Sequence, residues 1–245
     1  MSLKPKLLDG AVFIADAHEN ARRHGFSDFL ARLESGEIAP PQLFLMGDIF
    51  DLLFGDITHV IDNAKPYITR LEALAKRFPI YYFEGNHDFN LAPLFEFVHI
   101  IPLSKQPMCF ESPCGEVWMS HGDKYGTLGN VIYTKLIRQP WLLKGLNALN
   151  ELLGRPISRK LIDTLEAKKI CGKIHGFEEL IKKKLVFYPG QSPKTILEGH
   201  YHQNHRFEHQ GILYVNFSSF ACDQSYFVVQ CSQSIKFAQL RGGNV

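Results

Sequence analysis

Short, unbroken runs of apolar residues alternate with helical patterns along the first third of the chain. The runs cover residues 11–15, 43–46 and 80–83, and each reads as a buried strand. Between them, residues 26–34 carry apolar side chains at helical spacing, and residues 57–78 form a longer helical region. The order β, α, β, α, β predicts parallel strands with helices on their faces.

The pattern changes in the second half of the chain. Shorter strands are expected between residues 97 and 119. Residues 128–184 then show helical spacing with many Lys and Leu, which predicts a helical insertion over about 124–185. The last part returns to strands, of which those after the first alternate and turn quickly, as in an antiparallel sheet. These strands are expected at 195–197, 212–215, 226–229 and 235–237.

Polar residues follow directly after five of the predicted strands. Buried amides, imidazoles and carboxylates need partners, because their desolvation is costly. In parallel sheets the ligand site lies at the carboxyl ends of the strands, where these residues would meet. The residues in such positions are Asp16, His18, Asp48, Asn86, His87, His121, His200 and His202.

This set of side chains predicts a metal centre. Carboxylates and imidazoles with one amide and no thiolate suit Mn, Fe, Zn or Co rather than calcium. The spacing of two in Asp16/His18 and in His200/His202 puts both members of each pair on one side of an extended segment. Eight candidates exceed the needs of one tetrahedral ion. Two divalent ions bridged by one carboxylate, roughly 3.5–4 Å apart, explain the set.

Five motifs in order across residues 11–202 resemble the calcineurin-like metallophosphoesterases. They are Asp16-x-His18, Gly47-Asp48-x-x-Asp51, Gly85-Asn86-His87-Asp88, His121 and Gly199-His200-x-His202. The resemblance implies an α/β fold, a two-sheet αββα sandwich with an inserted helical lid, in a single domain spanning 1–245.

The resemblance also implies roles for the site residues. One metal, with Mn²⁺ favoured, is assigned to Asp16, His18, Asp48 and His202. The other is assigned to Asp48, Asn86, His121 and His200. His87 is then the catalytic histidine that does not bind metal.

The mechanism expected from this charge arrangement is hydrolysis. Two cations lower the pKa of a bridging water, and the resulting hydroxide attacks the phosphorus in line. His87 stabilises the developing charge or protonates the leaving oxygen. Asp51, Asp88 and Asp123 are expected to orient ligands or cap helices.

Charge is unevenly distributed along the chain. Residues 124–185 hold thirteen Lys/Arg against five Asp/Glu, a net +8, whereas the remainder, with 14 against 20, carries −6. The basic stretch is either a solvated helical face or a surface for an anionic partner. Candidate substrate-binding residues in it are Arg138, Trp141, Arg159, Lys160, Lys168 and Lys169.

The basic, Leu-rich insertion is similar to the lid of the UDP-2,3-diacylglucosamine pyrophosphatases of lipid A synthesis. The similarity implies cleavage of an acylated nucleotide sugar to UMP and 2,3-diacylglucosamine 1-phosphate at a membrane surface. Cations would hold the diphosphate, and apolar walls would hold the acyl chains. His87 departs from this group, which usually has Arg there. The alternative is an amphipathic subdomain that packs its own leucines, Leu142, Leu146, Leu149 and Leu152.

Two further functions remain open. One is a phosphodiesterase or phosphatase that acts on a soluble nucleotide or another phosphoester. The other is a non-catalytic scaffold that kept the fold to bind a partner. No nucleic-acid partner is expected.

Composition limits the compartment. With 45% hydrophobic and 21% charged residues, the chain is typical of a globular protein. It has no run of eighteen apolar residues and no secretory signal at its start, so a cytoplasmic location, or a peripheral one at the inner face of the membrane, is expected. Its five cysteines show no CxxC spacing, which predicts free thiols in a reducing compartment.

Overall fold

The computed structural model describes residues 4–125, 128–190, 194–231 and 234–241. Its first layer of strands is a six-stranded sheet in the order β13-β12-β1-β2-β4-β6. β1, β2, β4 and β6 run parallel, and β12 pairs antiparallel with both β1 and β13. The strands are β1 (Val12–Ile14), β2 (Leu43–Leu45), β4 (Ile80–Phe83), β6 (His99–Ile101), β12 (Ser225–Cys231) and β13 (Ile235–Arg241). The three apolar runs at the start of the chain are therefore the parallel strands that the pattern predicts.

A second sheet of five strands packs against the first, in the order β10-β11-β9-β8-β7. Its strands are β7 (Met108–Ser112), β8 (Gly115–Ser120), β9 (Lys194–Glu198), β10 (His205–His209) and β11 (Ile212–Asn216). The expected antiparallel pairing holds for β12 with β13 and for β11 with β10, whereas the other neighbour of β11, β9, runs parallel to it. Alternating apolar and polar residues show which side chains point to each face of a sheet. They do not show whether the neighbouring strand is parallel or antiparallel, so the sequence of β11 does not predict its pairing with β9.

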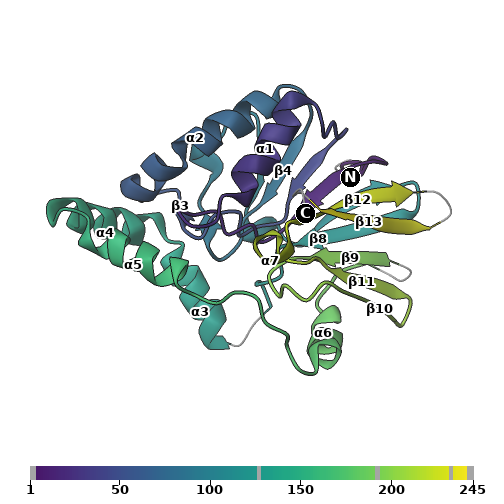
Figure 1. The fold of residues 1–245 in the computed structure, drawn as a ribbon. Helices are drawn as coiled ribbons and strands as arrows, with labels where there is room; N and C mark the ends of the chain where they lie inside the picture. Colours follow the sequence, from purple (N-terminus) through teal and green to yellow (C-terminus); the bar gives the residue numbers. More distant parts are fainter. Residues whose placement is uncertain (1–3, 126–127, 191–193, 232–233, 242–245) are drawn as a thin grey trace.

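Helices cover the outer face of each sheet, which gives the αββα sandwich (Figure 1). α1 (Gly25–Ser35) and α2 (Thr58–Ala75) lie over the first sheet, and α6 (Phe177–Leu185) lies over the second. α1 buries Phe26, Phe29, Leu30 and Leu33, the apolar stripe of its sequence. Shorter elements connect the layers: β3 (Leu53–Phe54), β5 (Asp88–Phe89), two 3₁₀ turns (Ala92–Leu94 and Leu103–Lys105) and α7 (Phe220–Asp223).

Three further helices, α3 (Leu128–Ile137), α4 (Pro140–Leu152) and α5 (Pro156–Glu166), follow β8. α4 and α5 lie side by side and project from the sandwich (Figure 1). Leu143 of α4 is buried against Val60 and Phe89, which anchors the pair to the body. The residues predicted as an insertion, 124–185, thus contain α3, the projecting pair α4 and α5, and α6, which covers the second sheet. Residues 126 and 127 lie outside the described part. Within the described ranges, no helix has the length and apolarity to cross a membrane.

The cysteines require a correction. Cys171 and Cys222 form a disulfide that closes a sequence separation of 51 residues, so the prediction of free thiols throughout is wrong for these two. Cys109, Cys114 and Cys231 are thiols. The pairing depends on tertiary proximity, because Cys171 precedes α6 and Cys222 belongs to α7. Spacing along the chain carries no signal of such a contact.

Candidate metal centre

The polar residues after β1, β2, β4, β8 and β9 converge at the carboxyl ends of these strands. Three groups of residues each have ligand atoms within 4.8 Å of one another, and the first two groups share His18. The first is Asp16, His18 and His202; the second is His18, Asp51 and His87; the third is Asp48, His121 and His200. Strand topology therefore brings together residues that lie up to 186 positions apart in the chain.

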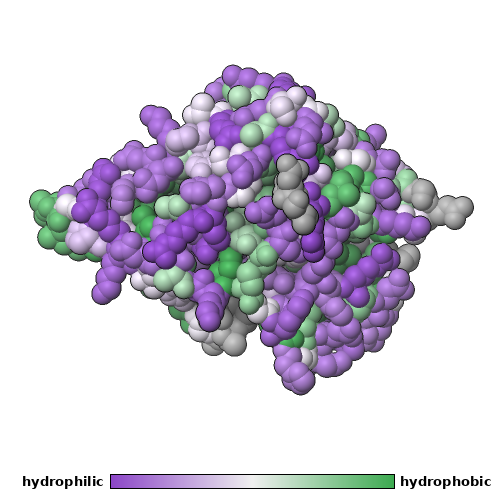
Figure 2. All heavy atoms as spheres, viewed as in Figure 1, coloured by the Kyte–Doolittle hydropathy of each residue, from purple (hydrophilic) through white to green (hydrophobic). Residues whose placement is uncertain are grey.

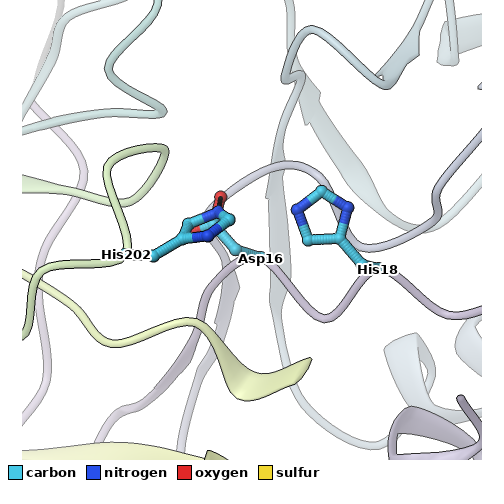
Figure 3. A group of neighbouring side chains, drawn as sticks. All are labelled: Asp16, His18 and His202. Carbon is cyan, nitrogen blue, oxygen red and sulfur yellow. Dashed lines mark ion pairs between the residues drawn. The ribbon is translucent and has the colours of Figure 1, made fainter. Parts of the chain in front are cut away.

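Asp16 is the centre of the first group. Its carboxylate is fully buried, with Oδ1 3.2 Å from His202 Nε2, and it accepts hydrogen bonds from the backbone N–H of His200 at 2.9 and 3.0 Å. His18 comes from the same loop as Asp16, and His202 comes from the loop after β9. Figure 3 shows the three side chains close together.

Asp48 is the centre of the third group. Its Oδ2 lies 3.4 Å from His121 Nε2, and its Oδ1 accepts the backbone N–H of His87 at 2.8 Å. His121 Nε2 also lies 3.3 Å from Asn86 Oδ1, so the amide joins this group. The stretch Gly85–Asp88 thus contributes to the site through both a side chain and a backbone donor.

Three histidines are oriented by their Nδ1 atoms. His18 Nδ1 donates to Asp51 Oδ1 at 2.9 Å. His121 Nδ1 and His202 Nδ1 each donate to a backbone carbonyl at 2.8 Å. These bonds direct each Nε2 toward the other candidate ligands, the arrangement usual for metal-binding histidines. His18 Nε2 is buried and has no hydrogen-bond partner among the described residues. An unpaired buried nitrogen beside two carboxylate-centred groups fits a bound cation.

The backbone around the site has a conformation that lets the candidate ligands approach closely. A Cβ at Gly85 would overlap Asp48 Oδ1, and one at Gly199 would lie 2.6 Å from Asp16 Oδ2, so only glycine fits at either position. Non-glycine residues with positive φ also gather here, and such strain concentrates at functional sites. They include Asp16, His18, Asp48, His200 and His202.

Electrostatic coupling between the groups sets their charge. Burial lowers the pKa of His121, but the charge of Asp48 outweighs burial and holds this pKa well above its ordinary value. Burial conversely raises the pKa of Asp48, and His121 prevails to leave it well below its ordinary value. Burial, and then the charge of His121, lower the pKa of His200 to about 4, so its imidazole is neutral and able to coordinate.

His87 differs from the other histidines. Its Nδ1 donates to the carbonyl oxygen of Asp51 at 2.7 Å, and its ring lies 5.1 Å from that of His18. It lines a cavity of about 650 Å³ whose lining also includes His18, Asp48 and Asn86. The imidazole is therefore accessible from the space above the candidate ligands.

Asp88 and Asp51 support the candidate ligands as expected. Asp88 accepts the backbone N–H groups of Asp48, Ile49 and Gly85 at 2.7–2.9 Å and the hydroxyl of Tyr82 at 2.5 Å. It thereby joins the loops after β2 and β4. Asp51 orients His18, and it also accepts hydrogen bonds from Asn20 and Arg23. Asp123 instead pairs with Arg138 at 3.4 Å.

The candidate substrate-binding residues separate into three sets. Lys168 and Lys169 line the cavity beside the candidate ligands. Arg138 donates to the carbonyl of Gly85 at 2.7 Å and is mostly buried, so it contacts the loop that carries Asn86 and His87. The third set lies on the exposed surface of α4 and α5 and consists of Trp141, Arg159 and Lys160.

Sequence reasoning missed the way in which residues 168–174 are held over the site. The carbonyl of Ile170 accepts His202 Nδ1, and Lys173 Nζ donates to the carbonyl of Gln203 at 2.8 Å. The Cys171–Cys222 disulfide adds a covalent link. No periodicity or motif marks this segment, so the sequence offered no signal beyond its lysines.

Comparison with known proteins agrees with this geometry. The chain is 28% identical over 156 residues to the UDP-2,3-diacylglucosamine hydrolase of Coxiella burnetii, covering 61% of this chain and 62% of that one. It is 35% identical over 107 residues to the hydrolase of the same name from Bordetella pertussis, covering 40% and 39%. The aligned part thus spans about three-fifths or less of these relatives.

A dimetal phosphatase from Danio rerio aligns with 96% of this chain and 96% of its own, at 12% identity and a TM-score of 0.49. The family model for calcineurin-like phosphoesterases matches residues 11–204, which include all eight residues at the strand ends. The chain belongs to the calcineurin-like phosphoesterase family.

Proposed function

We propose that the chain is a dinuclear-metal hydrolase that cleaves the pyrophosphate of UDP-2,3-diacylglucosamine to UMP and 2,3-diacylglucosamine 1-phosphate. The observation that carries the hydrolase is the convergence of three ligand groups at one cavity, which is lined by at least one member of each group. The substrate is supported by the name of the relatives in Coxiella and Bordetella.

Two divalent cations are the proposed cofactors, with Mn²⁺ favoured over Fe, Zn and Co. Asp16, His18 and His202 would hold one, and Asn86, His121 and His200 the other. Asp48 would be shared, because His18 of the first set donates its backbone N–H to the Asp48 carbonyl at 3.0 Å, and His121 Nε2 of the second set lies 3.4 Å from Asp48 Oδ2. When bound, such ions withdraw charge from the phosphoryl oxygens and make hydroxide available at neutral pH.

The chain's own residues would bind and protonate the substrate. His87, fixed through Nδ1 by the carbonyl of Asp51, can donate a proton from Nε2 to the leaving oxygen when its imidazole is protonated. Lys168 and Lys169 line the same cavity and would attract the diphosphate. Arg138, Trp141, Arg159 and Lys160 are proposed as further contacts from the helical projection.

An acylated substrate is favoured by the apolar residues of α4 and α5. Trp141 is 67% and Leu152 83% exposed, and Leu146 and Leu149 are also exposed, so these side chains are not packed into the projection's own interior. Figure 2 shows hydrophobic surface at the outer end of this pair. A second cavity of about 390 Å³, lined by apolar residues of α2 and by Ile162 of α5, extends as far as Asp51. Such a surface, with basic residues around it, also suits contact with an anionic membrane.

A soluble phosphoester is the second candidate substrate. It is favoured by the main cavity, whose lining mixes histidines and lysines with Ile170 and Ile174 and includes none of the apolar residues of α4. Assays of UDP-2,3-diacylglucosamine and of a soluble dinucleotide with Mn²⁺ separate the two. Release of UMP from the first, with little turnover of the second, is the expected result. Turnover of the dinucleotide alone would reject the acylated substrate. Absence of both activities and of bound metal would indicate a scaffold.

A further inference from the structure

Lys184 is a buried cation at the end of α6, behind the candidate metal centre. It is only 5% exposed. Its Nζ donates to the carbonyl of Gly122 at 2.6 Å, to Glu198 Oε2 at 2.8 Å and to the hydroxyl of Tyr201 at 3.2 Å. A buried ammonium is costly unless its donors are paired, and here all three have partners.

Each partner of Lys184 adjoins a candidate ligand. Gly122 follows His121, and Tyr201 follows His200. Glu198 ends β9, two residues before His200. His121 and His200 belong to the same ligand group, and their rings lie 5.0 Å apart. Lys184 therefore connects the two loops that would hold one ion.

Glu198 completes a closed network. It is fully buried and also accepts hydrogen bonds from the hydroxyls of Tyr188 and Tyr214. A buried ion pair of this kind contributes little stability compared with apolar residues of the same size, but it can impose one geometry. Lys183, the preceding residue on α6, is exposed.

We propose that Lys184 is a positioning residue for the metal site of His121 and His200. It holds the loops after β8 and β9 at the separation that the shared ion requires. This inference rests on the proposed dinuclear centre. It predicts that loss of Lys184 weakens this site more than the site of Asp16, His18 and His202, because His202 Nδ1 is held separately by the carbonyl of Ile170.

Titration of the metal-free protein with Mn²⁺, followed by calorimetry, tests the proposal. The variants are Lys184→Met and the double variant Lys184→Met/Glu198→Gln, which leaves no unpaired charge in the interior. The matched control is Lys183→Met. The unmodified chain and the control should bind two ions with the same affinities. In the double variant one site should weaken about 10–100-fold, as for other residues that orient metal ligands.

Two additional measurements separate positioning from a general loss of structure. Circular dichroism should show the double variant folded, and activity should return when Mn²⁺ is raised to refill the weakened site. Unchanged affinities in the folded double variant, or equal weakening of both sites, would overturn the inference alone. No metal binding by the unmodified chain would overturn the proposed function together with it.

Discussion

The two carboxylate oxygens of Asp48 have different partners. One carboxylate oxygen accepts the backbone N–H of His87, and the other faces His121. Its backbone has a positive φ and is held by Asp88. The backbone N–H of His18 also donates to the carbonyl of Asp48 at 3.0 Å, so this residue contacts members of both proposed sites, as a bridging ligand would.

The substitution Asp48→Ala should remove both metals and all activity, because the shared carboxylate is lost from both sites. Elemental analysis of the purified variant, beside unmodified protein, measures the metal content. Retention of two ions per chain would contradict a bridging role.

The substitution His87→Ala should keep both metals and lower kcat, on the order of 10²–10⁴-fold for a general acid. Metal analysis together with steady-state kinetics checks this. His209→Ala on the edge strand β10 is the control and should leave kcat unchanged. Loss of metal from the His87 variant would show that His87 is a ligand instead.

Metal binding should release protons and should weaken as the pH falls. Because Asp48 raises the pKa of His121, that imidazole holds a proton at neutral pH which an incoming cation must displace. Calorimetric titration with Mn²⁺ in buffers of different ionisation enthalpy counts the protons. Affinity that is constant between about pH 6 and pH 8 would contradict this coupling.

At the scale of elements, α4 has apolar side chains on both its buried and its exposed side. Leu143 is buried against α2 and β5, whereas Trp141 and Leu152 are exposed. These exposed side chains are apolar, whereas the solvent-facing side of a helix is usually polar, and they flank basic side chains. The pair α4–α5 is therefore suited to contact an amphipathic ligand.

Trp141→Ala with Leu142→Ala should raise KM for UDP-2,3-diacylglucosamine far more than KM for a simple phosphodiester, because only the acylated substrate would contact the projection. Phe187→Ala, which removes an exposed aromatic residue just after α6, is the control. Parallel changes for both substrates would count against an acyl-binding lid.

At the scale of the whole molecule, the Cys171–Cys222 disulfide ties the segment over the cavity to α7. Residues 168–174 have no regular secondary structure and depend on this link and a few hydrogen bonds. The disulfide thus both stabilises the fold and holds in place a segment that lines the cavity.

Replacing both cysteines by serine should lower the free energy of unfolding by up to about 4 kcal/mol, the loop-closure value for a separation of 51 residues. Urea denaturation measures this. Unmodified protein in the presence of a dithiol reductant should show the same loss. An unchanged midpoint in the double variant would mean that the disulfide contributes nothing to stability.

The sequence by itself determined the parallel core and the residues at its carboxyl edge. Buried parallel strands are continuous apolar runs, so the polar residues after them, such as Asp16 and Asn86, stood out locally. Their meeting at one edge follows from the direction of the strands.

The tertiary structure alone decided which groups are partners. It determined which nitrogen of His18 and His121 faces the site, since that depends on acceptors distant in sequence. It paired Cys171 with Cys222, set β11 beside β9, and buried Lys184 although it ends a run of three lysines. Composition and periodicity describe one segment at a time, whereas these contacts join segments that only the folded chain brings together.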